Sequence, residues 1–316
     1  MNYTLHQLRI FVEVVQKESI TKAAEALHLT QPAVSIQLKN FQQQFDIPLT
    51  ELINKKLYIT DFGKEIAVAA ENILNEAYAI RYRTMAYKGK LAGRLRISAA
   101  STGKYVIPYF LADFLKRHEE IELELDVTNK TRVVESLEKN EVDFALVSAM
   151  PENLELNVIL LMENKLFLVG NQALPTVAKS DPPKHILSSI PLIYREPGSA
   201  TRVAMEAFIA ARAVEVHKKI VLTSNEAVKQ AVIAGLGYSI MPLIGIKNEL
   251  LNGQLRIIPL PGLPVVSHWN LVWLSDKKNS PVASAYIDFV KQEKERIIAT
   301  HFGWLGSFAG DVSFSY

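Results

Sequence analysis

The chain has 316 residues, a net charge of +2 and no cysteine. The absence of cysteine excludes disulfides, thiolate metal sites and cysteine nucleophiles, and the near-neutral charge favours no class of partner. The length allows two or three domains. The sequence contains no apolar run of membrane-spanning length, and its start lacks the basic and apolar segments of a signal peptide, so we expect a cytoplasmic protein.

The first elements are predicted to be two helices and a tight turn. Apolar residues recur at helical spacing over residues 4–17, which predicts an amphipathic helix. A second helix is expected from Lys22 to Leu27, where the adjacent Ala23 and Ala24 allow another helix to approach closely. His28 and Leu29 then form the turn.

A third helix is expected to begin at Thr30, a good N-cap, with Pro32 in its first turn. One stripe of this helix is apolar and consists of Val34, Leu38, Phe41 and Phe45. Another stripe is polar and consists of Gln31, Ser35, Lys39 and Gln42. Such side chains can hydrogen-bond to base edges and phosphates, so this helix is a candidate for DNA recognition.

The pattern alone also fits a three-helix bundle with a polar outer face. Residues 1–60 contain six basic and five acidic side chains, a balance of +1, whereas a phosphate-binding surface usually carries more positive charge. Lys39, Lys55 and Lys56 could all lie on the DNA side.

Residues 8–41 closely resemble the winged helix-turn-helix domain of the LysR-type transcriptional regulators, above all in Ala23-Ala24 and in Thr-Gln-Pro-Ala-Val-Ser over 30–35. The following residues resemble the wing of that domain, with two departures. The family usually has Phe where Thr50 stands and Arg where Leu52 stands, which leaves the lysines of the wing as phosphate contacts. The apolar Ile36 could touch a thymine methyl group, or nothing. The expected DNA-binding residues are Thr30, Gln31, Pro32, Ser35, Ile36, Lys39, Lys55 and Lys56.

A long helix is expected over residues 61–90, the linker between this domain and the rest. Its seam alternates at steps of four and three through Ile66, Ala70, Ile73, Ala77, Ile80, Thr84 and Tyr87. A single helix cannot bury such a seam on itself. Dimerisation through this helix is the functional interpretation, and packing against the rest of the chain is the alternative.

Beyond Arg94, short apolar strands alternate with amphipathic helices, which predicts α/β sheets covered by helices on both faces. The pattern divides near 164–165 and again near 265–268. Two crossings suggest two lobes. Lobe I comprises residues 91–164 and 267–300, and lobe II comprises 165–266. The tail, 301–316, resembles nothing familiar and its role stays open.

A cleft between two lobes can close on a small molecule, and loops after strand ends should line it. Several such loops carry hydroxyl, amide or cationic groups suited to an anion. For any one loop, an ordinary helix cap is the more probable explanation; their number on one rim favours a ligand. The expected effector-binding residues are Ser101, Thr102, Lys104, Asn129, Ser148, Arg195, Ser199, Thr201 and Asn225. Arg202 is a second cation that could meet a multiply charged anion.

This half resembles the effector-binding domain of LysR-type regulators, which has the type 2 periplasmic-binding-protein fold. Segments 101–118 and 195–202 are particularly similar to regulators of RuBisCO (Calvin-cycle) operons. The resemblance implies a phosphorylated sugar or related metabolite as effector, with contacts from Ser101, Thr102, Asn129 and Thr201. Two departures, Ala200 for Gly and Lys130 for Arg, leave the effector and the regulated operon undefined.

Other functional classes are less well supported. The sequence has no Gly-x-Ser-x-Gly motif and no pair of histidines at helical metal-binding spacing, so we expect neither an enzyme nor a metal site or cofactor. A solute receptor shares the lobed fold but would not carry residues 1–60. The expected partners are promoter DNA, an anionic sugar phosphate or carboxylate, RNA polymerase, and further copies of the chain in a homodimer or homotetramer.

Overall fold

The computed structural model describes residues 3–53, 56–86, 90–173 and 183–306. The chain forms two compact units, Met1–Gly93 and Arg94–Tyr316. No helix within these described ranges is long and apolar enough to cross a membrane.

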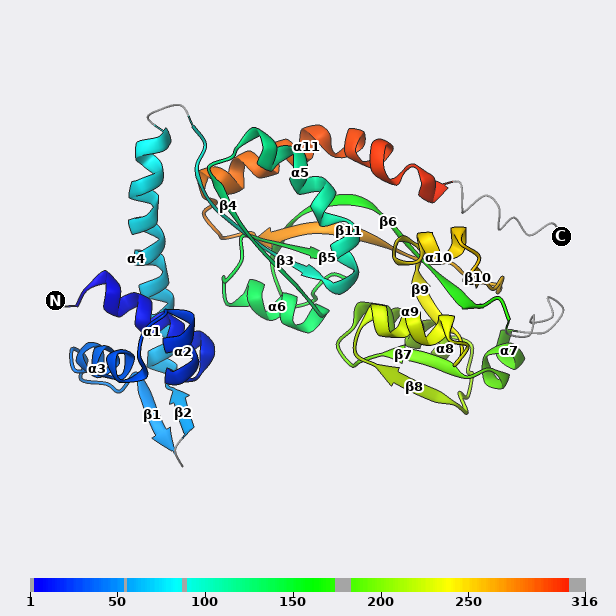
Figure 1. Ribbon diagram of the computed structural model, residues 1–316, viewed down its shortest axis with the longest axis horizontal. Helices are drawn as coiled ribbons and strands as arrows, with labels where there is room; N and C mark the ends of the chain where they lie inside the picture. Colours follow the sequence, from blue (N-terminus) through cyan, green and yellow to red (C-terminus); the bar gives the residue numbers. More distant parts are fainter. Residues whose placement is uncertain (1–2, 54–55, 87–89, 174–182, 307–316) are drawn as a thin grey trace. The chain divides into compact units, whose positions relative to one another are not determined.

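The first unit consists of helices with a two-stranded wing (Figure 1). Its elements are α1 (Leu5–Lys17), α2 (Ile20–Ala26), α3 (Gln31–Gln42), β1 (Thr50–Ile53), β2 (Lys56–Ile59) and α4 (Asp61–Ala86). The two strands are antiparallel, with Leu52 opposite Leu57. Apart from the start of α2, which lies two residues earlier, the helices begin within a residue of their expected positions.

Local capping explains where these helices begin. The hydroxyl of Thr4 accepts a hydrogen bond from the backbone N–H of Gln7, and the backbone N–H of Thr4 donates one to the side-chain oxygen of Gln7. Thr30 caps α3 by accepting from the Ala33 backbone at 3.4 Å. Between α2 and α3, His28 adopts φ 54°, a left-handed conformation that lets the chain reverse within two residues.

One apolar core holds this unit together. Phe11, Val34 and Phe41 are buried in it, and the early turns of α4 add Ala67 and Ala70. The adjacent Ala23 and Ala24 of α2 are buried, as their small size suggested. The expected apolar stripe of α3 therefore faces inward, although Phe45 at its end is only partly buried.

The second unit contains the α/β fold. The elements of lobe I are β3 (Gly93–Ala100), a 3-10 turn η1 (Ser101–Tyr105), α5 (Ile107–Arg117), β4 (Ile121–Thr128), α6 (Lys130–Glu138), β5 (Phe144–Val147) and α11 (Pro281–Phe302). Strands β3 and β5 are parallel. Phe144 on one face of β5 contacts Tyr286 of α11, while its neighbour Ala145 packs against α6. Helices thus cover both faces of the sheet, as expected.

Lobe II also has helices on both sides of its strands: its first two strands form a parallel pair of their own, and its last two join the large sheet of lobe I through a long connecting strand. Its elements are α7 (Pro183–Ser189), β7 (Leu192–Arg195), α8 (Ala200–Ala210), β8 (Lys219–Leu222), α9 (Asn225–Ile233), β9 (Ser239–Pro242), η2 (Leu243–Gly245), α10 (Lys247–Leu251) and β10 (Leu255–Ile257). Leu192 faces a cluster with α7 and α8, and Ile193 faces a cluster with α9. The sequence pattern predicts strands at 191–194, 219–224 and 238–241 and helices at about 200–213 and 225–234 in this lobe, so α7, α10 and β10 are additional elements.

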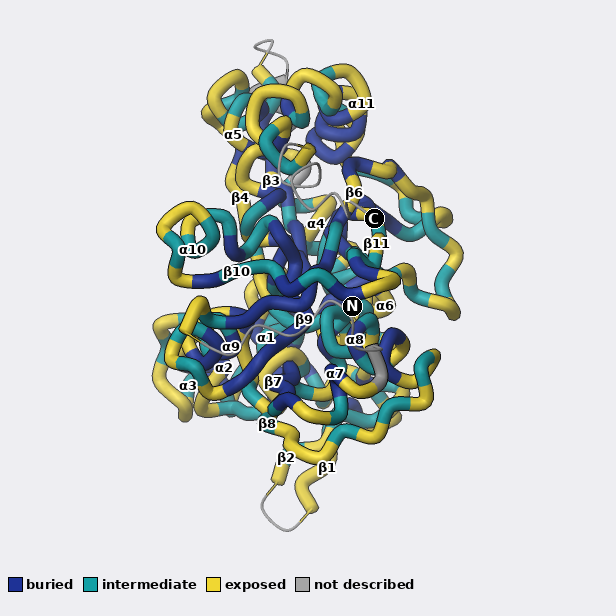
Figure 2. Tube along the Cα trace, turned by 90° about the vertical axis from the view of Figure 1, so that its right-hand side faces the viewer, coloured by how far each residue is buried: buried dark blue, intermediate teal, exposed yellow. Residues whose placement is uncertain are grey.

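Two long strands join the lobes, β6 (Leu156–Asn171) and β11 (Val265–Leu274). They are antiparallel and remain paired through both crossings, with Lys165 opposite Val266 and Asn164 opposite Ser267. The buried Asn164 amide donates to the Ser267 hydroxyl at 3.1 Å. Figure 2 shows dark blue, buried segments where β6, β9 and β11 meet. The crossings are therefore one continuous ribbon, where short separate strands were expected.

Candidate functional site

The polar stripe of α3 is on the surface. Gln31 and Lys39 are exposed, Ser35 is half-buried, and the apolar Ile36 has 58% of its surface exposed. Pro32 is also exposed, whereas the Thr30 hydroxyl is used in the helix cap. The exposed groups can donate and accept hydrogen bonds along one helix face, which suits an edge-reading role in a DNA groove.

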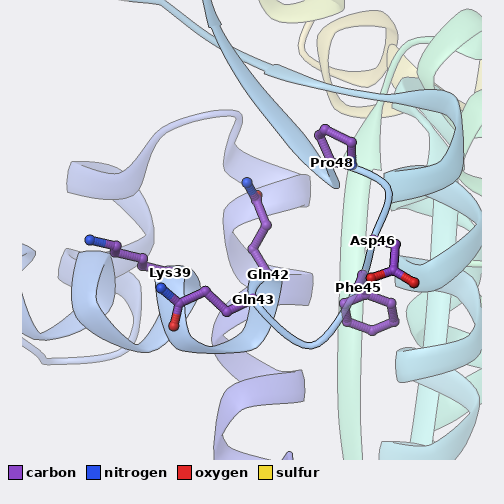
Figure 3. A pocket seen from close by; sticks show the side chains of 6 residues that line it. All are labelled: Lys39, Gln42, Gln43, Phe45, Asp46 and Pro48. Carbon is purple, nitrogen blue, oxygen red and sulfur yellow. The ribbon is translucent and has the colours of Figure 1, made fainter.

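The wing is tied to α3 by a side-chain hydrogen bond. Thr50 of β1 donates to Oε1 of Gln42 at 2.7 Å. Figure 3 shows Lys39 and Gln42 of α3 beside a shallow hollow that Phe45, Asp46 and Pro48 complete. Leu52 is 69% exposed, Lys56 is exposed, and Lys55 lies outside the described residues.

The seam expected on α4 is divided between two environments. Ile66 and Ala70 belong to the core shared with α1. Further along, Ile73 is 42% and Ile80 is 66% exposed. Tyr87 and the side chain of Thr84 lie outside the described residues. The alternative of packing against the chain is thus seen at the start of the seam, at Ile66 and Ala70.

In the second unit, Ser101 and Thr102 form η1 directly after β3. Thr102 is only 6% exposed, and Gly103 beside it packs so closely on Leu146 that an added Cβ would lie 2.9 Å away. The tight packing holds the backbone of this turn in place. Lys104 extends into solvent, with its ammonium 5.1 Å from the Tyr105 ring.

The loop before α8 approaches lobe I. Gly198 has φ +84°, and a Cβ there would lie 2.6 Å from the Thr131 hydroxyl of α6. The next residue, Ser199, is 4% exposed and is the N-cap of α8, yet its side chain makes no capping hydrogen bond. A hydroxyl and the first N–H groups of an 11-residue helix are thus available to an anion.

A hydrogen-bonded chain of four side chains crosses between the lobes. The Asn225 amide nitrogen donates to the Ser101 hydroxyl at 2.9 Å. Arg195, 5% exposed, donates through Nη1 to the Asn225 oxygen. Its Nε and Nη2 donate to the two carboxylate oxygens of Glu196, both at 2.7 Å. The positive charge expected to meet an effector is therefore already paired within lobe II.

The remaining expected residues have different settings. The side-chain oxygen of Asn129 caps α6 by accepting from the Arg132 backbone N–H at 3.0 Å. Ser148 and Thr201 are half-buried. Arg202 pairs with Glu206 at 2.8 Å. Glu196 was not among the expected residues, although its position directly after a buried arginine was a usable signal, because buried charges need partners.

Acidic and basic side chains of α9 and α10 form an ion-pair network, one member of which, Glu226, is influenced by the charge of Lys104. A hydrogen bond from Gln230 and the ammonium of Lys229 hold the pKa of Glu226 below its usual range, and Lys104 acts in the same direction. Lys229 also pairs with Glu249 at 2.7 Å. The described residues hold no cluster of His, Cys, Asp and Glu able to bind a metal ion.

Two family models match the chain. The bacterial regulatory helix-turn-helix protein, LysR family, matches residues 5–64, and the LysR substrate binding domain matches residues 88–295. Together they cover both structural units.

Curated relatives match almost end to end. The chain is 34% identical to the HTH-type transcriptional activator CmpR of Synechocystis, over 94% of this chain and 97% of that protein. It is 36% identical to a RuBisCO operon transcriptional regulator of Allochromatium vinosum, over 94% of this chain and 98% of that one.

Two solved structures of regulators have folds similar to that of this chain. The regulatory domain of Synechocystis CcmR, determined in complex with 2-PG, is 30% identical, with a TM-score of 0.60 over 66% of this chain and 98% of that one. Full-length CbnR in complex with its target DNA has a TM-score of 0.63 over 92% of this chain and 99% of that one. At 18% identity, the latter likeness concerns the fold alone.

Proposed function

Because the chain belongs to the LysR family of transcriptional regulators, and so joins a DNA-binding helix-turn-helix to an effector-binding domain, we propose which of its residues perform each task. The family resemblance and the fold class predicted from the sequence are confirmed. The protein is a regulator, like the relatives it matches.

The exposed face of α3 reads the bases of a promoter site. Gln31 and Ser35 supply hydrogen bonds to base edges, and Ile36 supplies an apolar contact. Thr30 and Pro32 at the start of the helix and the cations Lys39, Lys55 and Lys56 contact the DNA backbone. The wing carries exposed Leu52 where the family resemblance implies Arg, so this protein relies more on α3 for its DNA affinity than its relatives do.

The effector is a small phosphorylated carboxylate or sugar phosphate bound between the lobes. The observation that carries this proposal is Ser199, a buried hydroxyl without a capping bond at the N-terminus of α8. Ser101, Thr102 and Thr201 add hydroxyl groups, and Asn129 and Ser148 line the rim of lobe I. Lys104 supplies the positive charge, because Arg195 is already paired. The 2-PG held by the similar CcmR domain supports this class of ligand.

Assembly follows from α4. The exposed Ile73 and Ile80 pair with the same residues of a second copy, which presents two α3 helices to two half-sites. Further pairing through the effector domains gives a tetramer. Effector binding changes the angle between dimers, and this alters DNA bending and the recruitment of RNA polymerase.

Calorimetric titration tests the effector proposal. The full-length protein is titrated with 2-PG (2-phosphoglycolate), with a sugar phosphate and with glycolate, the unphosphorylated counterpart of 2-PG. We expect the phosphorylated ligands to bind, glycolate to bind at least tenfold more weakly, and Ser199→Ala to weaken 2-PG about tenfold. Ser280→Ala is the matched control, because Ser280 is an N-cap that does bond its helix, α11. Failure of every phosphorylated ligand to bind would contradict the proposal.

A further inference from the structure

Asn225 is the only side chain of the four-residue chain that contacts both a charged group and a residue of the other lobe. It is 7% exposed and stands at the start of α9 in lobe II. Its amide oxygen faces Arg195, and its amide nitrogen faces Ser101 in lobe I. The orientation of this amide decides what Ser101 can offer to a ligand.

The chemistry of arginine fixes that orientation. A guanidinium has only donors, so it accepts no hydrogen bond and must be met by the oxygen of the Asn225 amide. A flipped amide would place an NH2 group against an N–H. The NH2 group therefore points to Ser101, whose oxygen must act as the acceptor.

Glu196 keeps the arginine in place. Its carboxylate occupies both Nε and Nη2, which leaves Nη1 for Asn225. The pair is largely buried, with Arg195 at 5% and Glu196 at 16% side-chain exposure. Charge-assisted bonds of this kind are short and directional, and successive bonds in a chain polarise one another.

We infer that Asn225, held by Arg195 and Glu196, is a positioning residue that turns the Ser101 hydroxyl into a hydrogen-bond donor toward the cleft. A hydroxyl has one proton, and the bond from Asn225 occupies an oxygen lone pair and leaves that proton unused. Ser101 can then donate to an anionic oxygen. This inference rests on the proposed anionic effector, and it attributes the preference of the site for anions to the donor orientation of Ser101.

This chain of hydrogen bonds, from Glu196 through Arg195 and Asn225 to Ser101, is called the relay below. It gives two of the expected effector contacts a different role. Arg195 and Asn225 act through Ser101 instead of touching the effector. The buried positive charge is cancelled locally by Glu196, so the ligand meets the oriented Ser101 hydroxyl of lobe I together with the α8 N-terminus of lobe II.

The isosteric change Asn225→Asp reverses the relay. A carboxylate can accept from Arg195 but cannot donate to Ser101, so the serine must donate to Asp and present its lone pairs to the ligand. We expect the dissociation constant for 2-PG to rise at least tenfold. Asn225→Asp with Glu196→Gln restores the net charge, and we expect the weak binding to persist, because the hydroxyl still points the wrong way.

A double-mutant cycle that combines Ser101→Ala with Asn225→Asp isolates the effect of the Ser101 hydroxyl orientation. Ser101→Ala should weaken 2-PG about tenfold in the wild-type protein and less than about twofold in the Asn225→Asp background. Equal effects in both backgrounds, or full rescue by Glu196→Gln, would overturn the inference. Glu206→Gln, which removes the corresponding carboxylate from Arg202, is the matched control and should leave binding unchanged.

A measurement without ligand separates this inference from the proposed function. In the ligand-free full-length protein, Asn225→Ala should speed amide hydrogen exchange in residues 101–105, whereas Glu206→Gln should not. If the wild-type protein binds no phosphorylated anion, the proposed function fails, while the exchange data still test the hydrogen bond between Asn225 and Ser101. Unchanged exchange in Asn225→Ala would refute a positioning role for that bond, whatever the ligand result.

Discussion

The hydroxyl of Thr50 donates to the side-chain oxygen of Gln42 across 2.7 Å, and this bond joins the first strand of the wing to the recognition helix. Gln42 is the last residue of α3, so the bond fixes the angle at which β1 leaves the helix region. Phe, which the family resemblance implies where Thr50 stands, could not make this bond.

The first prediction concerns that bond. Thr50→Val keeps the shape of the side chain and removes the donor, which should cost about 1 kcal/mol of local stability. Native-state hydrogen exchange of the full-length protein should show faster exchange in β1 and β2. Thr50→Ser keeps a hydroxyl and should restore slow exchange; if the two variants behave alike, the bond has no such role.

The second prediction separates base reading from backbone contact in α3. Gln31→Ala and Ser35→Ala should lower affinity for the native promoter by about 1 to 3 kcal/mol and leave random DNA largely unaffected. Lys39→Ala should weaken binding to every sequence and reduce the slope of affinity against salt by about one unit. Fluorescence anisotropy at several salt concentrations measures both. Equal losses on promoter and random DNA in all three variants would refute these roles.

The third prediction concerns the exposed part of the α4 seam. Ile80→Glu should shift the protein to a smaller sedimenting species, because it places charge where two copies of the seam would pack. Val68→Glu is the control: Val68 is 50% exposed on the same helix but off the seam. A shift in both variants, or in neither, would count against dimerisation through this seam.

The fourth prediction concerns the end of the chain. Trp304 and Leu305 follow α11, whose aromatic side chains pack in lobe I, yet they contact an apolar cluster of lobe II. The Lys247 ammonium lies 4.5 Å from the centre of the Trp304 ring. A chain ending after Phe302 should lose about 2 kcal/mol of stability, visible as a melting temperature several degrees lower. Trp304→Ala together with Leu305→Ala in the full-length chain removes the same contacts and should lower the melting temperature similarly.

Local signals explain which parts of the structure the sequence predicted. The spacing of Val34, Leu38 and Phe41 and the cap at Thr30 act within one or two helical turns, so they are legible without any tertiary information. The short α7 and α10 give too few residues for a period. In β6, the polar run Glu163, Asn164 and Lys165 interrupts the apolar pattern, although all three pair with β11.

The hydrogen-bonded relay between the lobes could not be predicted in the same way. Asn225 lies 30 residues from Arg195 and 124 residues from Ser101, so their contacts exist only in the folded domain. Sequence reasoning placed all three on one rim but treated each as a separate contact. Glu196 was missed because its partner is the guanidinium of Arg195, whose burial is a property of the folded domain.

The paired crossing of β6 and β11 limits how the lobes can move. Two independent linkers would permit twisting, sliding and opening, but a hydrogen-bonded ribbon resists shear in its own plane and bends readily only across it. A register shift between Trp269 and Asn270, near the Asn164–Ser267 bond, marks a natural place for that bend. We therefore expect the two lobes to move mainly by a bend of this ribbon. Ligands of different shape would then all change the same quantity, the angle between the lobes.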